Sequence, residues 1–198
     1  MCAAHQVRSS SSYSAGEIVE AQWTAHARNL QRFRTEQPPY SLLVRGIELD
    51  VLPTARRHGM GILTDSPLAG GWLSGSWSAD SSPTSPARQR LVARFDMSLS
   101  ENQRKLEAVE QLAKVADEAG VSLIELAIAF VVNHPAVTSA IIGPRTMEQL
   151  DSQLPAAEVA LDPAILDRID EIVKPGVNLN PADTSYGEQV FKPSLRRR

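Results

Sequence analysis

The chain has 198 residues, of which 42% are hydrophobic and 22% are charged, and its formal net charge is −3 at pH 7. The hydrophobic fraction suits a globular domain, and the mild acidity argues against a nucleic-acid surface, which needs an excess of positive charge. Cys2 is the only cysteine, so a disulfide within the chain is excluded. Residues 1–8 lack the apolar core of a signal peptide, and no apolar run approaches the roughly 18 residues of a membrane span. We therefore expect a cytoplasmic protein with no membrane partner.

The first predicted unit is a short strand followed by a helix. Residues 5–8 are the remnant of a strand, and residues 9–14 are predicted to form a polar loop. A helix is predicted over residues 15–33, because apolar side chains recur there every three or four positions. Ser14 is its predicted N-cap, and Glu17 completes a capping box.

Two further strands with a helix between them are predicted next. Residues 35–43 are extended, but the strand must end near Gln37 because the two prolines that follow cannot donate to a ladder. A helix is predicted over residues 45–58. Residues 60–64 form a short apolar run that ends in Thr64, which is typical of a buried parallel strand.

The second half of the chain is predicted to be mainly helical. Residues 76–100 have a loop composition. The predicted elements after it are helix 101–119, helix 123–133 with Ser122 as its cap, strand 137–142, helix 146–154 and helix 163–173. Short apolar strands that alternate with helices predict parallel βα units. We expect these units to form one domain over residues 1–175, followed by a C-terminal tail over residues 176–198.

The most specific motif directly follows the strand at 60–64. It reads Ser-Pro-Leu-Ala-Gly-Gly-Trp-Leu-Ser-Gly over residues 66–75. A turn of small residues after a buried strand presents backbone N–H groups to a phosphate. This segment resembles the loop after the seventh strand of the aldo-keto reductases, where the pyrophosphate of the cofactor lies.

Three more segments resemble the same family, in the family's order. Ser11 and Ser12 resemble the pair after the fifth strand, Gln37 resembles the residue that ends the sixth, and residues 141–150 resemble the turn and helix start after the eighth. The resemblance implies that the first two segments hold the nicotinamide carboxamide and that the last binds the adenosine 2′-phosphate. The implied cofactor-binding residues are Ser11, Ser12, Gln37, Ser66, Leu68, Gly70, Gly75, Gly143, Arg145, Thr146 and Gln149.

Two positions depart from the family pattern. Asp65 stands where the family has an aromatic residue that stacks on the nicotinamide, and Ser76 stands where a lysine often follows the pyrophosphate loop. Residues 78–96 are a candidate lid over that loop. Its Arg88, Arg90 and Arg94 are candidates to replace the lysine.

The resemblance also implies a fold and an activity. The fold is α/β, a partial (β/α)8 TIM barrel equivalent to roughly the C-terminal half, with three to four parallel strands and flanking helices. The implied activity is NADP(H)-dependent reduction of a small-molecule carbonyl, in which a tyrosine gives a proton while the nicotinamide gives hydride. The family's catalytic Asp, Tyr, Lys and His come from the first four strands, for which we find no counterpart, so no catalytic residue and no metal ligand is assigned.

Three functions remain open at this point. The chain works as a reductase when the missing half completes it, or it binds NADP(H) without catalysis, or it is a half-barrel that self-associates. Half of a barrel has two open sheet edges, each a row of unpaired backbone groups, and this favours association with a homo-oligomeric or other partner.

Overall fold

Four parallel strands with six helices make up the part of the chain that the structure, a computed structural model, describes: residues 7–77 and 91–184. The strands are β1 (Ser9–Ser11), β2 (Thr35–Gln37), β3 (Gly61–Thr64) and β4 (Ser139–Ala140). They pair in chain order, and each pair is parallel. The architecture is an α/β fold consistent with a partial (β/α)8 barrel.

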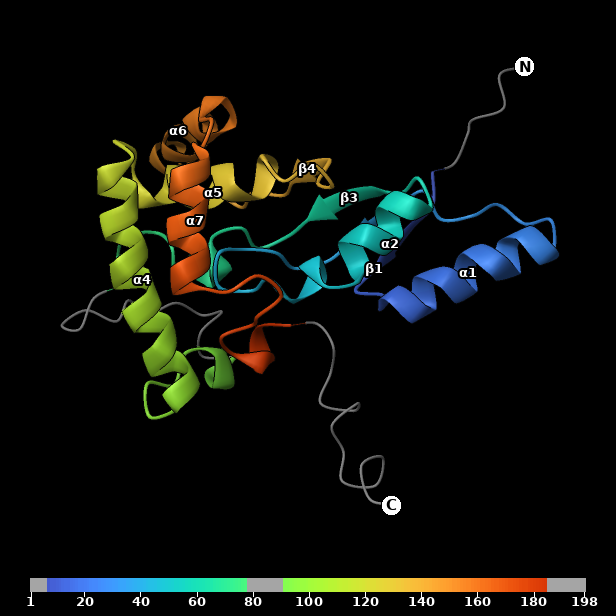
Figure 1. Cartoon of the computed structure of the whole chain (residues 1–198), viewed down its shortest axis with the longest axis horizontal. Coiled ribbons are helices and arrows are strands. Elements are labelled where there is room, and N and C mark those ends of the chain that lie inside the picture. The colour runs from blue at the N-terminus through green and yellow to red at the C-terminus, as the bar shows by residue number, and fades with distance from the viewer. Residues whose placement is uncertain (1–6, 78–90, 185–198) are drawn as a thin grey trace.

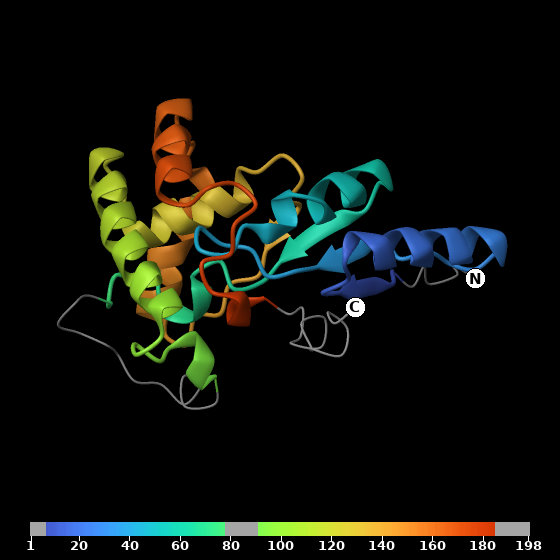
Figure 2. The same ribbon diagram turned by 60° about the horizontal axis from the view of Figure 1, so that its bottom comes forward.

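The helices gather at the two ends of this sheet (Figures 1 and 2). At one end α1 contacts α2, and at the other α4 packs against α5 and α7. The bounds are α1 (Ala15–Ala27), α2 (Val51–Arg57), α4 (Ser100–Glu118), α5 (Leu123–Val132), α6 (Met147–Gln153) and α7 (Pro163–Ile172). In the described residues no helix has both the length and the apolar character needed to cross a membrane.

Strand β1 lies where a polar loop was predicted, over residues 9–14, and that prediction is wrong for its first three residues. Ser10 is buried between two exposed serines, and its register partner is Glu36 of β2. The hydroxyl of Ser10 also donates to the carbonyl of Thr35 at 3.3 Å. Pairing with β2 and these local bonds outweigh the low strand propensity of serine, since that propensity depends strongly on context.

Two predicted helices are shorter in the structure. Helix α1 begins with the expected capping box of Ser14 and Glu17, but it ends at Ala27 instead of continuing to residue 33. Asn29 has a positive φ of 52°, which turns the chain away from the helix axis. The predicted helix 45–58 is divided into a 3₁₀ turn, Gly46–Glu48, and α2.

The core joins the helices to the first loops of the sheet. Helix α5 is buried on most sides, as its apolar sequence predicts, and Leu126 and Val131 have no exposed surface. Trp72 and Leu73, at the end of the glycine-rich loop, are equally buried in the same cluster. The loop is therefore anchored in the core at its C-terminal end.

The described part of the predicted tail also packs against the domain. Residues 177–184, which we call the strap, cross from α7 to the region between β2 and α2. The N–H of Arg45 donates to the carbonyl of Val177 at 3.0 Å, and the N–H of Leu179 donates to the carbonyl of Leu43 at 3.1 Å. The strap then reaches η5 (Pro181–Asp183), a single 3₁₀ turn beside α4.

Candidate functional site

The carboxyl ends of the parallel strands bring several predicted residues together. Ser11 is the register partner of Gln37, and its hydroxyl donates to the Gln37 carbonyl at 3.1 Å. The N–H of Ser12 donates to the same carbonyl at 3.1 Å. One strand further, the N–H of Asp65 donates to the carbonyl of Pro38 at 3.0 Å. The turns after β1, β2 and β3 thus form one continuous edge, with Ser66 next along the chain.

Backbone strain is concentrated at this edge. In the described residues, the non-glycine residues with positive φ are Ser12 (59°), Ser66 (58°), Ala69 (50°) and Asn29 (52°). The first three lie in the turns after β1 and β3. Such conformations cost of order 1–3 kcal/mol each and cluster at functional sites. Their positions therefore favour a ligand at the carboxyl edge.

The loop over residues 66–75 is a compact pair of turns. The N–H of Ala69 donates to the carbonyl of Ser66 at 2.8 Å, and the N–H of Gly71 donates to the carbonyl of Leu68 at 2.9 Å. These two amides are therefore used inside the loop. Gly70 has φ of 67°, and a Cβ there would lie 3.1 Å from Cζ of Phe95. Both the backbone conformation and the close approach of Phe95 favour glycine at this position.

Gly75 has a different reason for being glycine. Its φ is 77°, but a Cβ at this position would meet no atom of residues 7–77 or 91–184 within 4 Å. Only the backbone conformation favours glycine there. The space beside it leaves room for a ligand to approach the chain.

The turn after β4 holds the remaining predicted residues. Thr146 is the N-cap of α6, and its hydroxyl oxygen accepts the N–H of Gln149 at 3.3 Å. In return, Oε1 of Gln149 accepts the N–H of Arg145 at 2.8 Å. Thr146 and Gln149 thus support the turn, whereas the Arg145 side chain is exposed next to the exposed Gly143. The turn joins the same edge, because the N–H of Ile141 donates to the carbonyl of Thr64 at 2.7 Å.

Glu36 is a functional candidate that sequence reasoning missed. Its side chain is fully buried, and Oε1 accepts the N–H of Tyr13 at 2.9 Å, next to the strained Ser12. The hydroxyl of Ser10 and the backbone N–H of Ser12 also lie beside this carboxyl and favour its charged form. Burial raises the pKa of this carboxyl. An acidic residue at the middle of a three-residue strand was the available signal.

Lys105 was also missed, although its spacing is informative. It lies four residues before Val109 and seven before Leu112, so it shares the buried face of α4 and has no exposed surface. Leu106, the apolar residue next to it in the sequence, is only partly buried. A lysine at a core position indicates a specific partner for its charge.

The predicted lid lies mostly outside the described residues. Arg88 and Arg90 belong to that part. Arg94 is described, and its Nε donates to the carbonyl of Ala182 in the strap at 2.7 Å. That contact occupies the arginine at the strap. In residues 7–77 and 91–184, no cluster of three or more His, Cys, Asp or Glu side chains is arranged to hold a metal ion.

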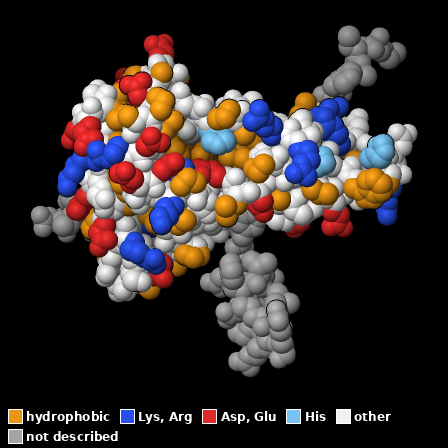
Figure 3. All heavy atoms as spheres, in the orientation of Figure 1, with side chains coloured by type: hydrophobic (Ala, Val, Ile, Leu, Met, Phe, Trp, Pro, Cys, Tyr) orange, Lys and Arg blue, Asp and Glu red, His pale blue; other side chains and the backbone are white. Residues whose placement is uncertain are grey.

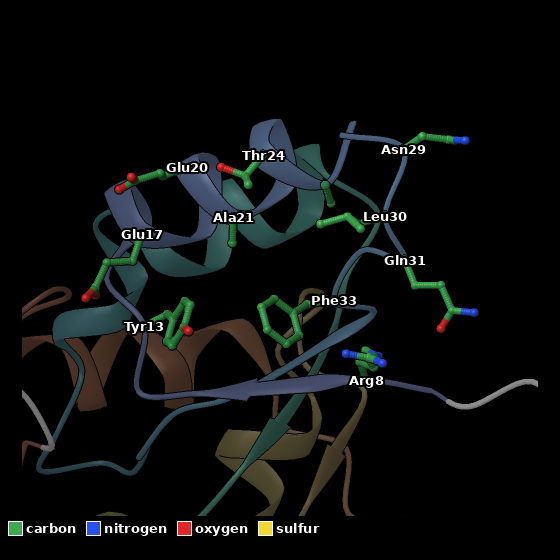
Figure 4. A pocket seen from close by; sticks show the side chains of 11 residues that line it. Arg8, Tyr13, Glu17, Glu20, Ala21, Thr24, Asn29, Leu30, Gln31 and Phe33 are labelled. Atoms are coloured by element: carbon green, nitrogen blue, oxygen red, sulfur yellow. The ribbon is translucent and has the colours of Figure 1, made fainter. Parts of the chain in front are cut away.

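A groove of about 710 Å³ lies apart from the predicted residues, at the β1 side of the sheet, where no other described strand pairs with β1. Figure 4 shows Tyr13 and Phe33 between α1 and the strand below it, with Arg8 at the strand and Glu17 on the helix. The rings of Tyr13 and Phe33 meet edge to face, with 5.8 Å between their centroids. None of the predicted cofactor-binding residues lines this groove.

Comparison with known proteins settles the family. Residues 9–174 match the model of the Aldo/keto reductase family. The chain belongs to this family of oxidoreductases. The described strands, the edge loops and the glycine-rich loop all fall within the matched residues.

The match to each relative covers only part of that relative's length. The chain is 39% identical over 163 residues to "Uncharacterized oxidoreductase YrpG" of Bacillus subtilis, which is 82% of this chain and 47% of the relative. It is 34% identical to "Probable voltage-gated potassium channel subunit beta" of Arabidopsis thaliana, over 83% of this chain and 51% of the relative. It is 32% identical to "Putative aryl-alcohol dehydrogenase AAD16" of Saccharomyces cerevisiae, over 83% and 47%. The chain spans about half the length of the curated relatives it matches.

Proposed function

We propose that this chain is the NADP(H)-binding, C-terminal half of an aldo-keto reductase barrel that reduces a small-molecule aldehyde or ketone. The observation that carries the proposal is the hydrogen-bonded edge at which Ser11, Ser12 and Gln37 meet, one strand from Ser66. Ligands of open parallel sheets bind outside the carboxyl ends of the strands. The strained turns at this edge add support.

Each part of the edge has a proposed role toward the cofactor. The side-chain amide of Gln37 supplies both a donor and an acceptor, as a nicotinamide carboxamide requires, and Ser11 and Ser12 add hydroxyl groups beside it. The loop at 66–75 faces the pyrophosphate, and the exposed Arg145 pairs with the 2′-phosphate. The cofactor, when bound, supplies hydride. The residues of this chain bind it and fix its orientation.

The proton for the carbonyl oxygen has no evident donor in the described residues. Tyr40 is fully buried and donates its hydroxyl to Glu48 at 2.7 Å, so it does not reach the carboxyl edge. Tyr13 lies in the groove beside Phe33. We therefore assign proton transfer to the half of the barrel that the relatives have beyond the matched length.

The β1 side is where that half is proposed to dock. The carbonyl of Arg8 and the N–H of Ser12 pair with β2, so the alternation of a parallel strand directs the N–H groups of Ser9 and Ser11 toward the open side. The groove with Tyr13 and Phe33 lies above this edge. A further strand and its helix would pair with the edge and cover the two rings.

A titration of the purified chain with NADPH tests cofactor binding. Trp23→Phe is the suitable background, because Trp23 is 68% exposed and would mask the buried Trp72 and Trp77 beside the loop. We expect a saturable fluorescence change at micromolar NADPH and weaker binding of NADH. No change up to millimolar NADPH, with calorimetry silent as well, would overturn the proposal.

A second candidate function is a self-associating module without catalysis. The groove favours it, as do the exposed side chains of Val19 and Trp23, which lie one turn apart on α1. Figure 3 shows hydrophobic side chains on the surface at the α1 side of the molecule. Large exposed apolar patches mark interaction sites. Sedimentation velocity of the chain alone separates the candidates, because a stable monomer at micromolar concentration contradicts self-association.

A further inference from the structure

A buried lysine connects three segments beside the glycine-rich loop. Nζ of Lys105 lies 2.7 Å from Oδ2 of Asp183 in the strap and donates to the carbonyl of Arg94 at 3.0 Å. It also lies 4.5 Å from the ring centroid of Trp72, on the loop side, a cation–π distance. Lys105 has no exposed surface and Asp183 is 9% exposed. The charge is therefore satisfied entirely within the fold.

The carbonyl of Arg94 links Lys105 to the loop at residues 66–75. Nε1 of Trp72 donates to the carbonyl of Arg94 at 3.2 Å, so Trp72 and Lys105 share one acceptor. Trp72 stacks on Trp77 with 3.8 Å between ring centroids, and Phe95 packs parallel to both. Phe95 also lies against the backbone of Gly70. The aromatic stack thus transmits the position of the Arg94 turn to the loop.

A second set of contacts binds the strap to the turn at Arg94. Nδ2 of Asn180 donates to Oδ1 of Asn102 at 2.7 Å and to the carbonyl of Ala93 at 2.9 Å. Nδ2 of Asn102 donates to the carbonyls of Ala93 and Asp96 at 3.1 and 2.8 Å. Both asparagines are buried. These bonds specify one position for the strap, because a buried polar group is costly unless its partners are in place.

Burial acts on both members of the ion pair. It lowers the pKa of Lys105 and raises the pKa of Asp183, and in each case the charge of the partner opposes the effect. Removal of one partner leaves an uncompensated charge in the core, which is strongly destabilising. Either loss is therefore expected to weaken the contact of Lys105 with the Arg94 turn, while the Asn180 and Asn102 bonds still hold the strap beside it.

We propose that the Lys105–Asp183 pair is a lock through which the strap fixes the conformation of the loop at 66–75. Lys105 and Asp183 are then positioning residues for pyrophosphate binding, acting through Arg94 and Trp72. The role in pyrophosphate binding rests on the proposed function. The effect on the loop conformation concerns the chain without ligand and does not depend on that function.

The first experiment measures the loop without any ligand. In the Trp23→Phe background, acrylamide quenching reports the access of solvent to Trp72 and Trp77. Asp183→Asn is expected to raise the quenching constant several-fold. Glu118→Gln is the matched control, because Glu118 forms an ion pair with Arg168 at 3.2 Å that is half exposed on both sides. Equal quenching in Asp183→Asn and Glu118→Gln would overturn the lock.

A double variant keeps the test decisive if Asp183→Asn does not fold. Lys105→Met with Asp183→Leu replaces the buried pair by apolar side chains of similar size, a change that buried ion pairs often tolerate. Because Arg94 then loses one donor to its carbonyl, we expect a folded chain whose tryptophans are still more accessible than in the parent. A folded double variant with unchanged quenching contradicts the proposal.

Ligand binding gives the second readout. Calorimetry with NADPH is expected to show a Kd increased about tenfold by either lock variant, which corresponds to 1.4 kcal/mol. Adenosine 2′-monophosphate, which lacks the pyrophosphate, is expected to bind all variants equally. A uniform loss of both ligands would indicate general destabilisation and overturn the positioning role. If the parent chain binds neither ligand, the proposed function fails, and the quenching result still decides the lock.

Discussion

Glu36 accepts the backbone N–H of Tyr13 through Oε1 at 2.9 Å, from within the core and directly beside the strained Ser12 turn. The contact joins a buried carboxyl of β2 to the turn that presents Ser11 and Ser12 at the carboxyl edge. Ser12, the residue before this hydrogen bond, has a φ of 59°, a conformation that the surrounding structure must hold in place. The chemistry proposed for the edge thus depends on a side chain that never faces the cofactor.

The Glu36 carboxyl predicts a pH dependence of stability. Its pKa is raised in the folded chain, so the folded state keeps the proton to a higher pH than the unfolded chain does. The contribution of Glu36 is complete below the unfolded value and is lost as pH rises through the folded value. Glu36→Gln is expected to raise the free energy of unfolding by about 1–2 kcal/mol at pH 8 and to leave it nearly unchanged at pH 4. Urea denaturation at both pH values measures this.

Glu17→Gln serves as the control of opposite sign. Hydrogen bonds from the backbone and hydroxyl of Ser14 lower the pKa of Glu17 at the start of α1. Its contribution is present above the unfolded value and is lost as pH falls, so the variant should be the less stable chain at pH 8. A gain in both variants at pH 8 would contradict the assignment for Glu36.

Two glycines of the loop separate backbone strain from packing. Gly70→Ala and Gly75→Ala both place a side chain at positive φ, which costs about 1–2 kcal/mol. Only Gly70→Ala also brings a Cβ to 3.1 Å from Phe95. We expect urea denaturation to show the larger loss for Gly70→Ala. Identical losses would mean that Phe95 gives way without cost.

Arg145 predicts the preference for the phosphorylated cofactor. Arg145→Met is expected to weaken NADPH binding at least tenfold, about 1.4 kcal/mol, and to leave NADH binding unchanged. Arg168→Met is the control for the loss of one surface arginine, because Arg168 is half exposed and pairs with Glu118 at 3.2 Å. Equal effects of Arg145→Met on both cofactors in calorimetry would place the 2′-phosphate elsewhere.

The open edge of β1 predicts how the chain associates. Ser9→Pro removes one N–H that points away from β2 and keeps the bonds made by Arg8 and Ser12. Any strand that pairs with this edge, from a second copy or from the rest of the barrel, should then bind more weakly. Sedimentation velocity across a concentration series measures the change. If Ser9→Pro associates as strongly as the parent chain, the association takes place through another surface.

Elements with a strong local signal were predicted well from the sequence. The capping box of Ser14 and Glu17 and the cap at Ser122 appear as expected, because each depends on residues only three positions apart. The apolar strand before the loop differs by one residue from β3. The resemblance assigned Ser11 and Gln37 to one group of the cofactor, and the register makes them neighbours, but their role toward the cofactor stays a prediction.

Features that depend on distant segments were not predictable in this way. Strand β1 has no apolar pattern and exists because β2 pairs with it. The partner of Lys105 lies 78 positions away, and the strap follows α7 with little periodicity to mark it. Local propensity carries no information about such contacts, since tertiary packing decides them.

The strap also has a consequence for the order in which the chain folds. Oδ1 of Asn178 in the strap accepts the N–H of Gly46, which lies 132 positions earlier in the sequence. This bond can form only after all four strands and the helices up to α7 have been synthesised. Helix α4 is synthesised before Asp183. The Lys105 ammonium therefore has no counter-ion until Asp183 has left the ribosome. A nascent chain that ends before Asp183 would therefore have to keep the Lys105 ammonium in water, so α4 cannot reach its final packing until the strap has been synthesised.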